Sequence, residues 1–293
     1  MRVTEKMMFQ AGQVQTGAAR ERLEKALGEV TSGKRFVHPS DDPAGSGLLV
    51  TAKAAQQRHA AIDQSVGRAA DELNFAEGVV GEVSNLVQRG RELAMQLGSG
   101  QYGASDRSNA AKEVDGLFNS LVGLMNSEVG GRYIFGGTQD GSLPFDTNGN
   151  YVGDANGRQI EIAPGVLQTV SLRADVGIKG VGGGTDVMQV FRDLSTAMRA
   201  NDVPGIEAAL SGLDNSLTQV SSLRTDAGSA LSILQTSSEV ASLNRHQMTI
   251  AVANISEVDL AEAASKMALA STALQAALSA TANSFKLSLI DKL

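Results

Sequence analysis

Residues 62–97 read IDQSVGRAADELNFAEGVVGEVSNLVQRGRELAMQL, and apolar side chains recur along them at alternating steps of four and three residues. The steps lead from Ile62 to Leu97 and are interrupted only at Gly90. An apolar stripe with this spacing runs along one face of an α-helix, where it packs against a second helix. The stretch therefore predicts a helix of several heptads that has a partner elsewhere in the chain.

The same spacing returns in the second half of the chain, between Ile206 and Ile255. A helix of about 50 residues would be about 75 Å long at 1.5 Å per residue. Since a chain of 293 residues is too small to surround such a helix on all sides, we expect a mainly α fold, namely an elongated antiparallel helical bundle or coiled coil. Polar residues at three stripe positions are interpreted as points of solvent exposure or helix interruption: Arg224, Ser238 and Arg245.

Residues 133–185 lack the helical spacing, and twelve of these 53 residues are glycine. Apolar and polar side chains alternate in two short stretches, 158–163 and 167–173, as they do in β-strands. We therefore predict a small inserted β domain. The glycine-rich stretch 177–186 is predicted to be a flexible return to helix, with Asp186 or the threonine before it as the helix cap.

Narrow stripes with the same spacing run along both ends of the chain, from Ala19 to Val30 and from Leu260 to Phe285. They are diluted by Ala, Ser and Thr, which bury little apolar surface. A buried CH₂ group contributes about 0.8 kcal/mol, whereas ordering one residue costs roughly 1–2 kcal/mol of backbone entropy. We therefore expect the N- and C-terminal helices to pair and to become firmly ordered only in contact with neighbouring copies. The residues predicted to form this assembly interface are Leu23, Val30, Leu260, Met267, Leu274, Leu278 and Phe285.

A loop that reads TSGKRFVHPSDDPAGSG, residues 31–47, separates the first terminal helix from the long one. Gly33 can end a helix in the left-handed conformation, and Pro39 favours extended backbone around it. Asp42 followed by Pro43 is a helix start with a capping side chain. The loop is therefore predicted to be a joint between the terminal segment and the bundle. The joint residues are Ser32, Gly33, Arg35, Pro39, Asp41, Asp42, Pro43 and Gly45.

The composition excludes several classes of function. The chain has no cysteine, which excludes disulfides, thiol catalysis and zinc sites built on cysteine. Its formal charge of −7 gives no overall attraction to nucleic acid or to an anionic membrane surface, so neither is expected as a partner. No stretch reaches the roughly 18–20 apolar residues of a membrane span. The opening MRVTEKMMFQAGQVQ also lacks the apolar run of a cleavable secretory signal.

Three motifs that could indicate a ligand or catalysis are better explained structurally. The run DTNGNYVGD at 146–154 places oxygen-bearing side chains at alternate positions, as a calcium loop does, but its sixth position is Tyr151 instead of glycine. GVGGG at 180–184 lacks the spacing of a nucleotide-binding loop. The carboxylates Asp41 and Asp42 precede a proline, as capping groups do. We therefore expect no metal, no cofactor and no enzymatic activity.

These patterns divide the chain into three expected parts. Residues 1–41 and 255–293 form the terminal helical assembly segment. Residues 42–132 and 186–254 form a helical rod domain, and residues 133–185 form a small β-rich outer domain.

Two stretches of the sequence resemble flagellins and their hook-associated relatives. TSGKRFVHPSDDPAG is similar to the loop after the first helix of these proteins, where Ser-Gly-x-Arg precedes Asp-Asp-Pro/Ala-Ala-Gly. ISEVDLAEAASKMALASTALQAALSA, residues 255–280, is similar to the start of their C-terminal helix. The opening MRVTEKMMFQ and the segment 130–145 are more similar to the hook-associated members than to the filament subunits.

The resemblance implies a structural role in the bacterial flagellum. It implies that the chain leaves the cell through the flagellar type III channel, without a cleavable signal peptide, after a cytoplasmic chaperone has held its C-terminal helix. Outside the cell, such subunits form a ring with copies of themselves, of eleven subunits in this family. The ring lies between hook and filament, in contact with a neighbouring hook-associated protein and with flagellin.

Two alternatives stay open at this point. The chain could be a flagellin, which builds the filament itself. The insertion could instead be a ligand-binding or hydrolytic module carried on a helical stalk, although residues 133–185 show no convergent set of polar side chains.

Overall fold

The computed structural model describes residues 2–290, and most of them lie in helices. The long helices are α1 (Arg2–Ser32), α2 (Pro43–Gly98), α6 (Val203–Ser256) and α7 (Leu260–Ile290). Shorter ones are α3 (Ala104–Met125), α4 (Ala174–Gly177) and α5 (Val187–Ala200). The chain divides into two compact units. One consists of Met1–Arg58 together with Asn244–Leu293, and the other, called the central unit, consists of His59–Leu243. Helices α2 and α6 contribute to both units.

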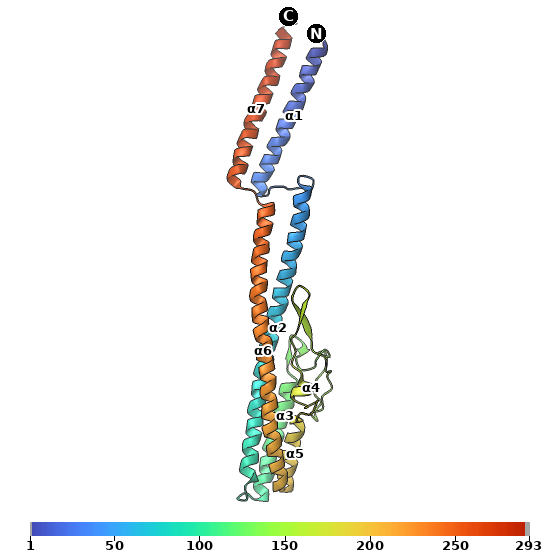
Figure 1. The fold of residues 1–293 in the computed structure, drawn as a ribbon, viewed down its shortest axis with the longest axis vertical. Coiled ribbons are helices and arrows are strands. Elements are labelled where there is room, and N and C mark those ends of the chain that lie inside the picture. The colour runs from blue at the N-terminus through green and yellow to red at the C-terminus, as the bar shows by residue number, and fades with distance from the viewer. Residues whose placement is uncertain (1, 291–293) are drawn as a thin grey trace. The chain divides into compact units, whose positions relative to one another are not determined.

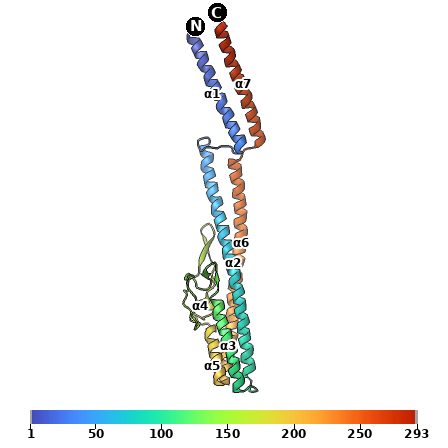
Figure 2. The same cartoon turned by 180° about the vertical axis from the view of Figure 1, so that it is seen from behind.

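The prediction of a mainly α fold with paired long helices is confirmed. Helix α1 pairs with α7, and in the central unit α2 pairs with α6 (Figures 1 and 2). The second pair is antiparallel, because Glu77 contacts Arg224 whereas Arg91, further along α2, contacts the earlier Asp214. None of the helices in the described part of the chain has an apolar run long enough to cross a membrane.

The core of the central unit lies along the predicted stripes. Helix α2 supplies residues at steps of four and three that are almost completely buried, and α6 meets them with its own stripe. Helices α3 and α5 pack on each other and complete the bundle (Figure 1). Core residues of α2 and α6 with no exposed surface include Val66, Val80, Val83, Val87, Leu213, Val220, Ala227 and Leu234.

The interruptions of the stripes have specific partners, and α6 continues through all of them. Nε of Arg224 donates to Glu77 at 2.9 Å, and Oγ of Ser238 donates to Asp63 at 3.2 Å. Of the two predicted explanations, helix interruption is wrong and solvent exposure is confirmed, since Arg224 and Arg245 are exposed and Ser238 is half-buried. Arg224 and Ser238 lie at the edge of the seam, where they bond to α2 and stay partly in solvent.

Two small antiparallel sheets and much irregular chain lie between α3 and α4, the first sheet beginning before the predicted insertion. Strand β1 (Glu128–Val129) pairs with β2 (Arg132–Tyr133), and β3 (Gln159–Ala163) pairs with β4 (Val166–Thr169). The strands predicted at 158–163 and 167–173 are thus present, although the second ends early because the chain turns into α4. A buried aromatic pair, Phe145 and the half-buried Tyr151 with ring centroids 5.2 Å apart, packs inside the insertion.

The glycine-rich return to helix, which was predicted to be flexible, is hydrogen-bonded to α6. The side chain of Gln219 on α6 donates to the carbonyls of Gly177 and Thr185 and accepts from the Thr185 amide at 2.9 Å. Asp186 then caps α5 by accepting from the Gln189 amide at 3.1 Å, as one of the two predicted caps. Glycine is needed here for tight turning, since Gly182 has a φ of +98°.

Candidate assembly interface

The joint begins where α1 ends. Gly33 terminates this helix, as predicted. Its φ is +67°, in the left-handed region, and its amide donates to the carbonyl of Glu29 at 3.0 Å. Ser32 adds a second closure by donating from Oγ to the Gly28 carbonyl at 2.6 Å. The carbonyls of Gly28 and Glu29 near the end of α1 therefore have partners, and the left-handed Gly33 turns the chain away from the helix axis.

Helix α2 starts with the predicted cap. Oδ1 of Asp42 accepts from the amide of Gly45 at 2.8 Å, and Pro43 is the first helical residue. Oδ2 of the same carboxylate accepts from the guanidinium of Arg35 at 3.0 Å. A Cβ at Gly45 would collide with this carboxylate. The cap and the ion pair thus use one side chain, and the glycine leaves space for it.

Pro39 and Asp41 shape the tip of the joint. The predicted extended backbone at Pro39 is wrong, because Pro39 lies in a turn that closes with the Asp41 amide donating to the His38 carbonyl at 3.0 Å. Oδ2 of Asp41 accepts from the His38 amide at 2.9 Å, and this bond is the main reason why the pKa of Asp41 lies below its usual value. Asp41 therefore stabilises the turn and caps no helix.

The joint also contains a contact that sequence reasoning missed. The amide of Arg35 donates to the carbonyl of Ser256 at 2.8 Å, and the amide of Val258 donates to the carbonyl of Gly33 at 3.1 Å. Lys34 and Glu257 are therefore paired as in an antiparallel sheet. The connection from α1 to α2 and the connection from α6 to α7 are hydrogen-bonded to each other. Short polar connections give no sequence signal for such pairing.

The pair formed by α1 and α7 is held by small side chains. Among the side chains that the structure describes in it, the buried apolar ones are alanines, namely Ala19, Ala26 and Ala263. Towards the chain ends, the hydroxyls of Thr16 and Thr281 lie 3.5 Å apart. Such a seam buries little apolar area, so its contribution to stability is small.

The predicted interface residues divide into two groups. Leu23, Val30, Met267 and Leu274 are half-buried, whereas Leu260 and Leu278 are 59% and 51% exposed. The side chain of Phe285 lies outside the described residues. The covered positions on α7 follow the expected steps of four and three, but lie one residue away at Ala263 and Ala277. These positions are Ala263, Met267, Ala270, Ser271, Leu274, Ala277 and Thr281.

Other large apolar side chains on these two helices are exposed. They include Val14 and Leu269, which are 71% and 70% exposed, together with Met7, Phe9 and Leu27. A pair of helices that buries alanines and exposes leucines and valines has unused apolar surface on several sides. This surface is what the prediction of ordering among neighbouring copies requires.

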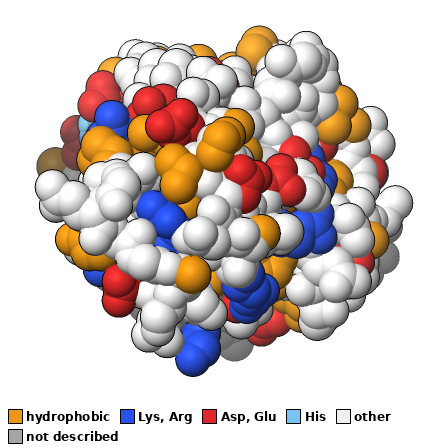
Figure 3. Space-filling view, turned by 90° about the horizontal axis from the view of Figure 1, so that it is seen from below, with side chains coloured by type: hydrophobic (Ala, Val, Ile, Leu, Met, Phe, Trp, Pro, Cys, Tyr) orange, Lys and Arg blue, Asp and Glu red, His pale blue; other side chains and the backbone are white. Residues whose placement is uncertain are grey.

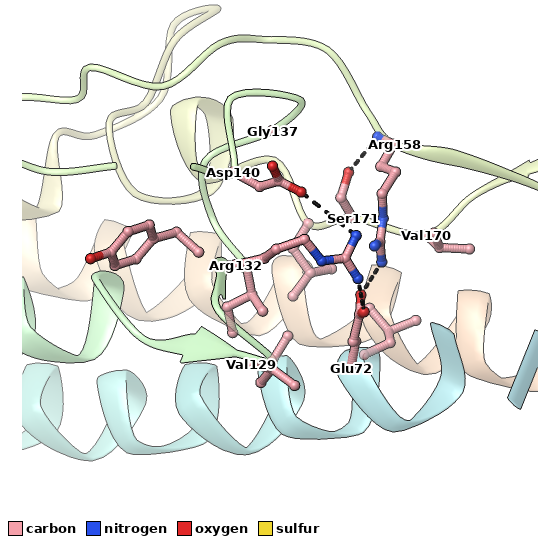
Figure 4. Close-up of a pocket in the computed structure, with 13 residues that line it drawn as sticks. Glu72, Val129, Arg132, Gly137, Asp140, Arg158, Val170 and Ser171 are labelled. Atoms are coloured by element: carbon pink, nitrogen blue, oxygen red, sulfur yellow. Dashed lines mark hydrogen bonds and ion pairs between the residues drawn. The ribbon is translucent and has the colours of Figure 1, made fainter. Parts of the chain in front are cut away.

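A second polar cluster attaches the insertion to the bundle (Figure 4). The carboxylate of Glu72 on α2 points towards two guanidiniums and is bonded through one oxygen to Arg132 and through the other to Arg158. Arg132 also lies 3.6 Å from Asp140. The carboxylate of Glu72 is only 16% exposed. The small cavity beside it, about 30 Å³, has room for little more than a water molecule.

Acidic side chains dominate the central unit. Residues 59–243 contain 12 Lys and Arg against 22 Asp and Glu, a formal charge of −10. Figure 3 shows acidic and basic side chains interspersed over the face that it draws, without a large area of one sign. Most arginines of the unit are bonded to carboxylates, as Arg89 is to Glu113.

The calcium-loop motif of the insertion is a turn. The carboxylate of Asp146 accepts from the amides of Asn148 and Asn150 and from the side-chain amide of Asn150, at 2.8–2.9 Å. The side-chain amide is the main reason why the pKa of Asp146 is lowered. Among the residues that the structure describes, no group of three His, Asp or Glu side chains could hold a metal ion.

Two family profiles match the chain. The bacterial flagellin N-terminal helical region matches residues 3–140, and the bacterial flagellin C-terminal helical region matches residues 210–293. Together they cover most of the chain, including the joint and both terminal helices.

Individual relatives agree with these matches. Flagellar hook-associated protein 3 of Salmonella typhimurium is 27% identical over 94% of both chains. Flagellin of Bacillus subtilis is 26% identical over 82% of this chain and 81% of its own. The crystal structure of flagellar hook associated protein-3 from Legionella pneumophila has a TM-score of 0.60 and 14% identity, covering 69% of this chain and 98% of its own. That structure shares the fold.

Proposed function

Because this chain belongs to the flagellin superfamily, in its hook-associated protein 3 branch, we propose that it joins hook to filament as a ring of identical subunits. It is a structural protein of the flagellum and not an enzyme. The single observation that carries the ring proposal is the pair of α1 and α7. Its buried apolar side chains, within the described part of these helices, are alanines, and Leu260 and Leu278 remain exposed for contact with further helices.

The parts of the chain would then have separate tasks. Residues 1–41 and 255–293 pack against the same segments of neighbouring copies and form the inner part of the ring. Residues 42–132 and 186–254 form a rod domain, and residues 133–185 form an outer domain. The weakness of the isolated α1–α7 pair supports this assignment, because a seam of alanines gains most when further helices cover its outer faces.

The proposed partners follow the same logic. Copies of this chain fill the ring, with eleven subunits as the expected number, and a hook-associated protein and flagellin lie on its two sides. Before export, a cytoplasmic chaperone covers the exposed apolar side chains of α7, such as Leu269. The subunit then reaches the outside through the flagellar export channel and orders its ends on assembly.

The test uses the full chain in a strain that lacks its own copy of the gene. Leu274→Asp places a charge at a half-buried position of α7, and Ala276→Asp places the same charge at an exposed position two residues away. We expect the Leu274 variant to be secreted with a folded central unit and to leave hooks without filaments, while filament subunits are released into the medium. The Ala276 variant should restore filaments.

Normal filaments with Leu274→Asp would refute the proposed packing role of α7. The deletion strain also separates the proposal from the flagellin alternative. Loss of a filament subunit removes that subunit from the medium altogether, whereas loss of the junction subunit leaves it there in unassembled form.

A further inference from the structure

The insertion contains two Asn-Gly pairs in exposed loops, Asn148–Gly149 and Asn156–Gly157. In such a pair the main-chain nitrogen of the glycine can attack the side-chain carbonyl carbon of the asparagine. Glycine presents no side chain that hinders the approach, and its backbone is the most adaptable of all residues. The two pairs share both residue types, so any difference in their reactivity comes from the fold.

The first pair is protected by its turn. The amide of Gly149 donates to the carbonyl of Asp146 at 3.0 Å, and Gly149 is buried. Gly157 of the second pair, by contrast, is only half-buried. Attack by the Gly149 nitrogen would have to break the hydrogen bond and move a packed residue.

The second pair lacks this protection. In the described part of the chain, no acceptor takes a hydrogen bond from the main-chain amide of Gly157, and Asn156 is exposed. Yet a glycine is required at 157, because a Cβ there would lie 2.5 Å from the methyl carbon Cγ2 of Thr169 on β4. The packing of the hairpin thus demands the residue that makes Asn156 reactive.

We propose that Asn156 is a site of spontaneous deamidation in the folded protein. The Gly157 nitrogen forms a bond to Cγ of Asn156, the bond from Cγ to Nδ2 breaks, and Nδ2 leaves as ammonia with the proton from the Gly157 amide. Water then opens the resulting cyclic imide at either carbonyl. The products are aspartate or isoaspartate at position 156, each with one additional negative charge.

The modification acts on a group of hydrogen bonds that meet at the carboxylate of Asp154, called the Asp154 hub. The carboxylate of Asp154 accepts from the main-chain and side-chain amides of Asn156 at 3.1 and 3.3 Å, and it also accepts from the amide and hydroxyl of Thr138. Deamidation replaces a donor with a second carboxylate beside Asp154, and like charges at this distance repel. Isoaspartate also adds a main-chain atom two residues before Arg158, which bonds to Glu72. The product therefore loosens the contact between the insertion and α2.

The full-length protein is incubated at neutral and mildly alkaline pH, and both pairs are followed by peptide mapping with mass spectrometry. Asn156 should deamidate about tenfold faster than Asn148, because breaking one hydrogen bond of ordinary strength slows a reaction by roughly this factor. In concentrated urea, where neither turn exists, the two rates should be similar. Equal rates in the folded protein, or faster reaction at Asn148, would overturn the proposal.

A second measurement tests the structural consequence. Aged protein and the Asn156→Asp variant should both show faster amide exchange at residues 136–140 than fresh protein, while the Asn156→Ser variant should not change on ageing. Unchanged exchange in aged protein that carries the modification would show that the Asp154 hub tolerates the added charge, contrary to the proposal.

Discussion

A Cβ at Gly90 would lie 2.9 Å from Cε1 of Phe191, so the ring of Phe191 on α5 occupies the place where the stripe of α2 has no side chain. Phe191 has no exposed surface. The missing side chain at Gly90 therefore leaves space for the ring of Phe191 from another helix.

Gly90→Ala should destabilise the central unit although alanine is the better helix former. Overpacking a close-packed core costs about 1–3 kcal/mol, which exceeds the roughly 1 kcal/mol gained in helix propensity. Gly78→Ala on the same helix is the matched control, since nothing lies within 4 Å of its added Cβ. Urea unfolding followed by helical circular dichroism should show a lower midpoint for the first variant and an unchanged or higher one for the second.

Glu72→Gln should loosen the insertion and leave the helices folded. The change removes the charge that Arg132 and Arg158 share and costs about 1–3 kcal/mol, as expected for hydrogen bonds to a charged group. Hydrogen exchange should therefore accelerate at residues 158–170. Glu82→Gln, at an exposed position of the same helix, should change stability by less than about 0.5 kcal/mol. Equal protection in both variants would contradict the role given to Glu72.

Two variants of Asp42 distinguish the contribution of the helix cap from that of the ion pair with Arg35. Asp42→Ala removes the acceptor for the Gly45 amide and should destabilise the first turn of α2 by about 1 kcal/mol, the usual loss for a helix cap. Asp42→Asn keeps a capping oxygen but loses the charge that pairs with Arg35. Because exposed ion pairs contribute little, this variant should stay close to the wild type. Amide exchange at Gly45 and Ser46 distinguishes the two.

Tyr151 makes stability depend on alkaline pH. Burial raises the pKa of Tyr151 from 10 to about 12, and the nearby charge of Asp175 acts in the same direction. The folded protein therefore keeps the phenol proton at pH values where the unfolded chain has lost it. This contribution is complete below pH 10 and is lost as the pH rises towards 12. Tyr151→Phe should remove this part of the pH dependence when urea unfolding is repeated across this range.

The sequence predicted the elements that depend on regular spacing or on residues with one strong local preference. The stripes located α2 and α6, and Gly33, Asp42 and Pro43 located the ends of the joint, because each favours one backbone conformation or one cap. The seam of α1 and α7 was placed less well. When most stripe residues are alanine or serine, neighbouring registers bury nearly the same area, so spacing alone does not choose between them.

Contacts between segments far apart in sequence could not be predicted. In the sequence, Gly90 is only an interruption of the apolar spacing, because its partner Phe191 comes from another helix. Gln219 gave no signal either, although its side chain is hydrogen-bonded to both ends of the glycine-rich loop. Such residues are recognised only once the fold brings the two segments together, since their role depends on tertiary contact and not on local preference.

The paired connections of the joint have a mechanical consequence. A single-stranded connection between two helices can change its φ and ψ angles within the sterically allowed regions without affecting any other segment. Here the Arg35–Ser256 and Val258–Gly33 hydrogen bonds join two connections side by side. A movement of either connection must therefore carry the other with it or break these two bonds.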